Sequence, residues 1–65
     1  MNGKVTAFDE RRGLGTVTAA DGTTYGFHAT QIAGGARTIA VGAAVTFEIV
    51  PGNLGRYEAA QITRN

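Results

Sequence analysis

The stretch RRGLGTVTAADGTTYGFHAT, residues 11–30, holds the features that decide the fold. Two segments rich in Val, Thr and aromatic residues, Gly15–Ala19 and Thr24–His28, flank the sequence ADGT at Ala20–Thr23. Because Asp-Gly tolerates the positive φ angles of a tight turn, this pattern predicts a β-hairpin. Two arginines begin the stretch and the only histidine of the chain stands near its end, a layout that suits the binding of a polyanion.

Outside the hairpin, the sequence predicts three further strands. They are segments in which Val, Ile, Thr, Phe and Tyr recur between turn signals, namely Lys4–Asp9, Ala43–Val50 and Tyr57–Thr63. The clearest signal is the alternation of Val45, Phe47 and Ile49 with polar residues, which is typical of a strand with one buried face. The sequence PGNLG at Pro51–Gly55 predicts the turn between the last two strands.

The segment Ala29–Gly42 differs from the strands because it contains several alanines, which favour helix. The pair Gly34-Gly35 interrupts it and prevents a long helix. We therefore expect a single helical turn around Thr30–Ile32, followed by a loop.

A chain of 65 residues suits one small domain, and we expect residues 1–65 to form it. Short strands laid out as a flat sheet would leave two edges that can pair with other chains. Closing the strands into a barrel removes both edges. The sequence therefore predicts an all-β fold, a small five-stranded antiparallel Greek-key barrel.

Composition argues against several classes of function. The sequence contains no Cys and no Ser, so the usual catalytic nucleophiles are missing and we expect no enzyme. The lone His28 has no second histidine or cysteine with which to hold a metal, and we expect neither metal nor cofactor. No apolar run approaches the roughly 18 residues of a membrane span, and the start of the chain lacks a signal-peptide pattern. We expect a cytoplasmic protein that does not bind membranes.

The formal net charge is +1 and the pI is about 8.3, which is low for a protein held to nucleic acid mainly by charge. Phosphate binding would therefore need a local cluster of cations. Arg11 and Arg12 form the best candidate, a clamp that binds phosphate in bidentate fashion. The alternative is a solvated turn whose charge is neutralised by Asp9 and Glu10. The other cations expected beside this clamp or along its rim are Lys4, Arg37 and Arg56.

A series of short motifs is spread along the whole chain, each at one position. They are Gly3-Lys4-Val5, Phe8, Arg12-Gly13, Gly15, Asp21-Gly22, His28, Ile32, Thr38-Ile39, Gly42, Val45, Phe47, Gly52-Asn53, Gly55, Ala59-Ala60 and Ile62. Each is weak alone, but their order and spacing together are specific. This frame resembles the bacterial cold-shock domain over essentially the whole chain. The resemblance implies an OB-fold that binds single-stranded RNA or DNA.

In the family that this chain resembles, two sheet motifs carry outward aromatic side chains that stack bases. The motifs fall on Arg12–Val17 and Tyr25–Ala29. Most of the ring positions hold other residues here, namely Leu14, Thr16, Gly26 and Ala29, with Ala7 for the family tryptophan, Thr6 for a basic residue and Ala36 near a loop aromatic. The resemblance implies that Phe8 and His28 are the rings kept on the binding face. It also places Leu14 on that face, at a position where the family has a ring.

Each of these two rings also has a purely structural interpretation. Phe8 can be half-buried beside Leu14, and His28 can be an exposed strand residue held by a neighbouring hydroxyl such as that of Thr30. Tyr25 and Phe27 replace family valines on the face that should point into the barrel. Either they enlarge the core, or a slip of one residue turns them outward and sends His28 in. The ungapped match to the family favours the first interpretation.

The leading hypothesis is a single-stranded nucleic-acid-binding module with low affinity, led by phosphate contacts because its aromatic surface is depleted. An alternative is a protein-interaction or self-association module. Its contact surface would be a smooth, weakly apolar face made of Ala7, Leu14, Gly26 and Ala29. A third possibility is a small-ligand binder, although the sequence names no ligand.

Overall fold

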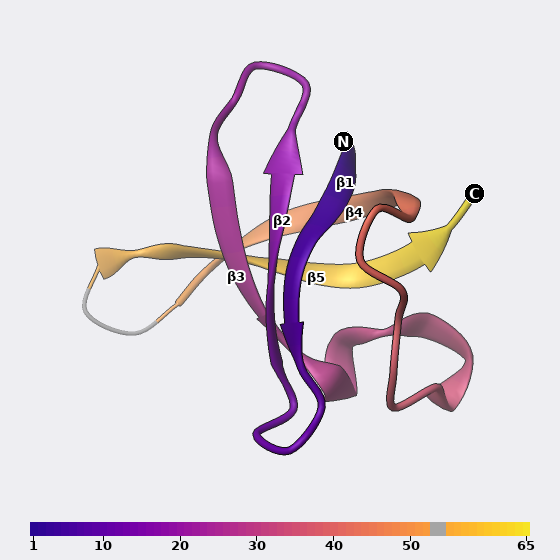
Figure 1. The fold of residues 1–65 in the computed structure, drawn as a ribbon. Helices are drawn as coiled ribbons and strands as arrows, with labels where there is room; N and C mark the ends of the chain where they lie inside the picture. Colours follow the sequence, from indigo (N-terminus) through magenta and orange to yellow (C-terminus); the bar gives the residue numbers. More distant parts are fainter. Residues whose placement is uncertain (53–54) are drawn as a thin grey trace.

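The computed structural model describes residues 1–52 and 55–65. Over these residues the chain forms five strands and two short 3₁₀ helices (Figure 1). In chain order the elements are β1 (Asn2–Asp9), β2 (Leu14–Ala19), β3 (Thr24–His28), η1 (Ala29–Gln31), η2 (Ala33–Gly35), β4 (Ala44–Pro51) and β5 (Tyr57–Arg64). Each predicted strand is confirmed, with boundaries that differ by no more than about two residues.

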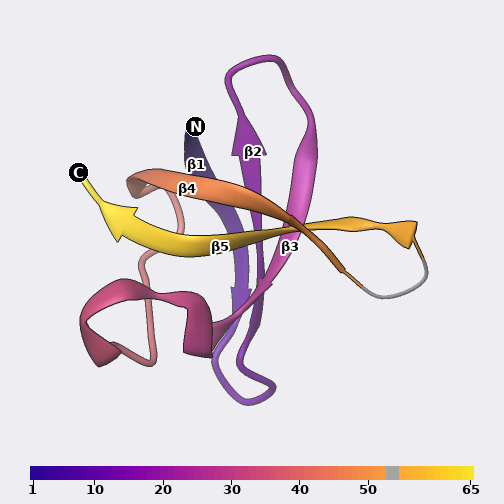
Figure 2. The same cartoon turned by 180° about the vertical axis from the view of Figure 1, so that it is seen from behind.

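The strands close into a barrel in the order β1-β2-β3-β5-β4. β1 pairs antiparallel with both β2 and β4, and β4 pairs antiparallel with β5. The barrel closes where β3 and β5 run parallel through Gly26 and Glu58. The predicted all-β Greek-key barrel is confirmed, and its closing pair is parallel rather than antiparallel. In Figures 1 and 2, β4 and β5 cross the β1–β2–β3 meander steeply, so the two layers enclose the core.

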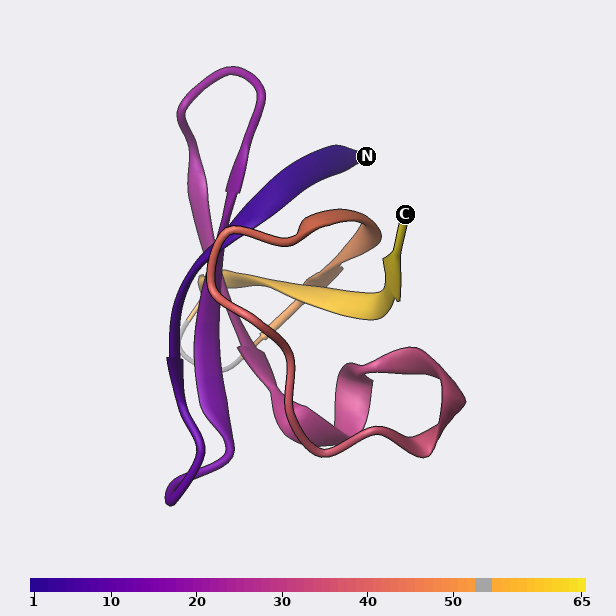
Figure 3. The same cartoon turned by 45° about the vertical axis from the view of Figure 1, so that its right-hand side comes forward.

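The connection between β3 and β4 contains the expected helical turn. This turn is η1, and Figure 3 shows it with η2 to one side of the barrel, from where the chain returns to β4. The second turn, η2, was not expected, and Gly34 interrupts its helical geometry with φ of 83°. Each 3₁₀ helix has three residues, and no helix in residues 1–52 and 55–65 is long and apolar enough to cross a membrane.

The hairpin between β2 and β3 turns through Ala20, Asp21 and Gly22. The N–H of Gly22 donates to the carbonyl of Ala19 at 2.9 Å, and the N–H of Ala19 donates to the carbonyl of Thr23 at 2.8 Å. Gly22 has φ of 89° but Asp21 is not left-handed, so the turn is looser than the tight Asp-Gly turn predicted from the sequence. Asp21 instead accepts a hydrogen bond from the N–H of Thr23 at 3.0 Å, which lowers the pKa of the Asp21 carboxyl.

The second predicted turn, at Pro51–Gly55, lies partly outside the described residues, because these exclude 53 and 54. Its two flanks are held together. Pro51 is the last residue of β4 and pairs with Tyr57, and the N–H of Gly52 donates to the carbonyl of Arg56 at 2.6 Å. β5 therefore begins at a defined position beside β4.

The core is built from the inward faces of all five strands. Four aliphatic side chains in it are completely buried, Val5, Val17, Val45 and Ile62. Phe27 and Phe47 add the two large rings, each 2% exposed. The alternation predicted for Val45 and Phe47 is thus confirmed, but Ile49 is exposed. Ile49 lies beyond the part of β4 that pairs with β1, where β4 pairs with β5 alone and extends past the core.

Tyr25 and Phe27 point toward the core, as the first of the two interpretations held. Phe27 is buried, whereas its neighbours Gly26 and His28 are exposed. Tyr25 is half-buried, and its ring lies 5.8 Å from that of Phe47 at an angle of 54°. The register Leu14↔His28, Thr16↔Gly26 therefore stands without the one-residue slip.

Glycines on neighbouring strands make room for the two buried rings. A Cβ atom at Gly15 would lie 2.7 Å from Cε1 of Phe27, and one at Gly3 would lie 2.9 Å from Cε1 of Phe47. Each phenylalanine thus covers a glycine backbone, which lets a small barrel hold a large ring.

Candidate nucleic-acid interface

The outer face of β1, β2 and β3 carries the residues at the expected base-stacking positions. Strand pairing places Ala7, Thr16 and Gly26 in one row across the three strands. A second row contains Leu14 and His28, which pair with each other, and both are exposed. The strands therefore bring the predicted positions together on one face, and most of the side chains there are too small to stack a base.

Threonine hydroxyls occupy the neighbouring part of this face. The Oγ1 atoms of Thr6 and Thr18 lie 3.1 Å apart, and the Thr6 hydroxyl donates to the carbonyl of Thr16 at 3.3 Å. Lys4 pairs with Thr18 at this end of β1. The arginines follow the other end of β1, roughly 17 Å away along the strand. The structure thus does not bring Lys4 to the arginine clamp, contrary to the expectation from sequence.

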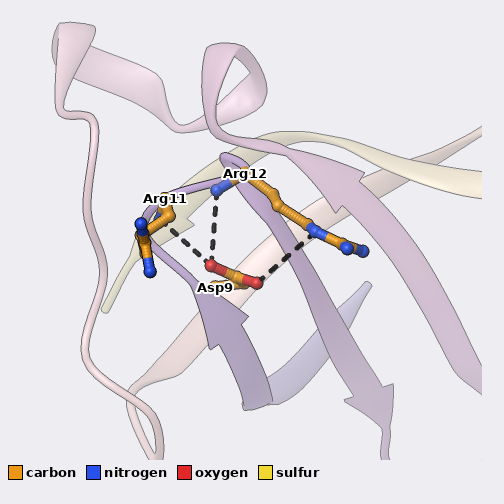
Figure 4. Close-up of polar contacts among 3 residues, drawn as sticks. All are labelled: Asp9, Arg11 and Arg12. Atoms are coloured by element: carbon orange, nitrogen blue, oxygen red, sulfur yellow. Dashed lines mark hydrogen bonds and ion pairs between the residues drawn. The ribbon is translucent and has the colours of Figure 1, made fainter.

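Arg11 and Arg12 lie in the turn between β1 and β2, and Asp9 organises that turn (Figure 4). One carboxylate oxygen of Asp9 accepts hydrogen bonds from the backbone N–H groups of Arg11 at 3.0 Å and Arg12 at 3.3 Å. The other lies 3.9 Å from Nε of Arg12. Gly13 completes the turn in a left-handed conformation, φ 66°. Asp9 therefore acts mainly on the backbone, and its long, exposed ion pair with Arg12 contributes little.

The two arginine side chains leave the turn in opposite directions (Figure 4). Both nevertheless line one hollow of about 510 Å³, which Arg37 also lines from the connection after η2. Glu10 is the one acidic residue among the described residues that line it, so the hollow carries an excess of two positive charges. We call it the arginine hollow. It joins three of the predicted cations, Arg11, Arg12 and Arg37.

Arg56 belongs to a different hollow, of about 500 Å³, between β3 and the start of β5. Tyr25, Gly26 and Tyr57 line it as well, and we call it the tyrosine groove. Tyr57 is 64% exposed and was missed by sequence reasoning. The signal that could have found it is its position just after the predicted turn at Pro51–Gly55, where β5 begins.

A smaller hollow of about 220 Å³ lies between these two, lined by Leu14, Gly26, His28 and Glu58 among others. Glu58 was also missed by sequence reasoning. It reaches this face because β5 closes the barrel beside Gly26. Its carboxylate is an acceptor that repels phosphate and can receive a hydrogen bond from an exocyclic amino group of a base.

Phe8 is tied to the core. Its ring lies 6.0 Å from that of Phe27 with the two planes 11° apart, and the side chain is half-buried. One face of the ring is therefore occupied by the protein. His28 remains exposed on the outer face. Ala29, expected on the same face, is half-buried against the core and lines the arginine hollow instead.

Among the described residues there is no group of three or more His, Cys, Asp or Glu side chains that could hold a metal ion. The charged groups lie in turns and on the barrel surface.

Comparison with known proteins agrees with this geometry. The family model described as the 'Cold-shock' DNA-binding domain matches residues 1–65. No match was found among curated proteins. The matched family is one of nucleic-acid-binding domains and not of enzymes.

Proposed function

Because the chain belongs to the cold-shock DNA-binding domain family, we propose that it binds single-stranded RNA or DNA weakly, through phosphate contacts more than through base stacking. The observation that carries this proposal is the arginine hollow. Arg11, Arg12 and Arg37 gather there at the end of an outer face whose ring positions hold Leu14 and other small residues.

The chemistry of this surface favours phosphate over bases. A guanidinium binds a phosphate through two parallel hydrogen bonds, and each phosphate contact releases counterions from the strand. The Asp9 carboxylate is engaged mainly with backbone N–H groups, and its contact with Arg12 is a long ion pair of 3.9 Å, so both arginines keep donors for a ligand. Each missing stack, by contrast, removes about 1–3 kcal/mol. The result is low affinity, strong salt dependence and little sequence preference.

Fluorescence anisotropy with a labelled oligothymidylate tests this proposal. With three phosphate contacts on a single strand, the logarithm of the binding constant falls by about 2 for each decade of salt. Between 50 and 200 mM salt the affinity should therefore fall about 20-fold. Arg11→Gln should weaken binding and reduce the salt slope by about 0.7.

Arg64→Gln is the matched control. Arg64 is an exposed arginine at the end of β5 and does not line the arginine hollow. It removes the same charge from elsewhere on the barrel. Absence of wild-type binding at low salt would contradict the proposal, and so would equal effects of the Arg11 and Arg64 variants.

The exposed Leu14 keeps a second function open, a protein-interaction or self-association module. Leu14 is 40% exposed and lines a small hollow together with Gly26. Light scattering distinguishes the two functions. A stable dimer that Leu14→Asp abolishes would favour self-association, and a monomer that binds the oligonucleotide would favour the first proposal.

A further inference from the structure

The tyrosine groove has the features of a base-binding site whose exposed ring, Tyr57, lies outside the positions that the family resemblance singles out. Tyr25 and Gly26 line it from β3, and Arg56 and Tyr57 line it from the start of β5. We propose that this groove binds one base of the nucleic-acid strand, stacked on Tyr57, with an adjoining phosphate on Arg56. The inference deepens the proposed function and rests on it.

Tyr57 is the ring that is free to stack. It is 64% exposed, whereas Tyr25 packs its ring against Phe47 in the core. Tyr25 is thus a fixed wall of the groove and Tyr57 the accessible surface. An aromatic side chain with an exposed face stacks any of the bases, because every base has a π-face.

The floor of the groove allows a flat ligand to approach closely. Gly26 has no side chain, and a Cβ atom there would meet only the carbonyl oxygen of Gly15, at 3.9 Å. Thr16 and Thr24 flank this glycine and offer hydroxyls to the edge of a base. Because position 26 has no ring, a nucleobase stacked on Tyr57 can lie directly over the backbone of Gly26.

The charge of the groove fits a strand that also occupies the arginine hollow. Arg56 is the single charged residue among the described residues lining the groove. The two sites lie at opposite ends of β3, because Ala29 lines the arginine hollow and Tyr25 lines the groove. Along the strand this separation is roughly 13 Å. One strand of nucleic acid can therefore run from the arginine hollow past His28 to Tyr57.

The test compares two ligands of equal charge, an oligothymidylate and an abasic sugar-phosphate strand of the same length, at low salt. Tyr57→Ala should weaken binding of the oligothymidylate about 5- to 100-fold and leave the affinity for the abasic strand unchanged. Tyr57→Phe should keep the wild-type affinity for both. Val41→Ala serves as the control, because Val41 is 61% exposed and lies in the connection before β4.

Intrinsic fluorescence gives a second readout. The chain has two tyrosines and no tryptophan, so its emission comes from Tyr25 and Tyr57 alone. Saturation with oligothymidylate should quench the wild type. In Tyr57→Phe, which still binds, the quenching should be lost.

The outcomes separate this inference from the function on which it rests. Salt-dependent binding by the wild type with no effect of Tyr57→Ala overturns the base site alone. An equal loss for the abasic and base-bearing strands also overturns it, because the ring would then not act on a base. Failure of the wild type to bind either strand overturns the proposed function and the base site together.

Discussion

Replacing Leu14, Thr16 and Gly26 together with phenylalanine should raise the affinity for single-stranded DNA about 30-fold. The substitution restores rings at three positions where the family resemblance expects them. It asks whether the low affinity comes from the missing side chains alone, on a backbone that still presents their positions correctly.

The magnitude follows from the geometry of the three sites. Thr16 and Gly26 are cross-strand partners, and Leu14 pairs with His28 in the adjoining row. At Gly26 the space above the backbone is open, since the nearest atom to a new Cβ is 3.9 Å away. Leu14 is 40% exposed, so a ring there reaches solvent. At the lower limit of about 1 kcal/mol for each stack, three added stacks give about 3 kcal/mol. The ring at 26 fills the floor of the tyrosine groove and displaces the base from Tyr57, which costs about one stack, so the net gain is about 2 kcal/mol, or about 30-fold in affinity.

Thr16 is the most crowded of the three positions. It is half-buried between Ala7 and Gly26, so a ring there must lie flat across its neighbours. The new ring at 26 lies directly opposite it, and an aromatic cross-strand pair stabilises the sheet by roughly 0.2–1 kcal/mol. We therefore expect the triple variant to fold.

The assay is an anisotropy titration of the wild type and the triple variant with the same oligothymidylate at equal salt, with circular dichroism to confirm the fold. Ile49→Phe adds a ring to an exposed site on β4 and controls for hydrophobicity alone. A folded triple variant whose affinity equals that of the wild type, or of the control, would refute the reasoning.

Two further predictions concern stability. Gly15→Ala should lower the free energy of unfolding by about 1–3 kcal/mol, because the new Cβ would lie 2.7 Å from Cε1 of Phe27 and 2.9 Å from the carbonyl oxygen of Ala7. Urea unfolding measures this loss of stability. If the ring of Phe27 is the cause, the loss caused by Gly15→Ala should be smaller in a Phe27→Leu background than in the wild type. Asp21 has a lowered pKa in the folded chain, chiefly because the N–H of Thr23 stabilises its charged form, so its contribution is present above pH of about 4 and is lost as the pH falls through the folded-state pKa. The difference in urea midpoint between the wild type and Asp21→Asn should therefore shrink on acidification, and a difference independent of pH would contradict this role.

The fold could be predicted because its signals are local. Alternation at Val45 and Phe47 reports which face of a strand is buried, and Asp21-Gly22 reports a turn, whatever the rest of the chain does. Phe27 was assigned to the core on different grounds, because the ungapped match to the family places it at an inward position, and its pairing with Gly15 agrees with that assignment. The parallel pairing of Gly26 with Glu58 has no such local signal, because it joins strands that are distant in the sequence.

The candidate site could be predicted best where its residues are close in the sequence. Arg11 and Arg12 share a turn, and their common hollow followed from that. Tyr57 was missed because its environment comes from β3, and Lys4 was placed beside the arginines although the length of β1 separates them. Motif spacing gives the identity of a surface residue, but its neighbours are set by how the barrel closes.

That closure has a consequence for the motions of the barrel. The β1–β2–β3 meander is joined by short turns, whereas β3 meets β5 only after the intervening connection and β4 have been laid down. Because of the entropy cost of closing a long loop, the junction between β3 and β5 forms late in folding. Since few residue pairs hold this junction, it is also where the barrel opens first. Tyr25 and Gly26 lie on one side of it and Arg56 and Tyr57 on the other. A nucleic-acid strand bound in the tyrosine groove would contact both sides of this junction and stabilise its closed state, so the ligand would slow amide hydrogen exchange along β3.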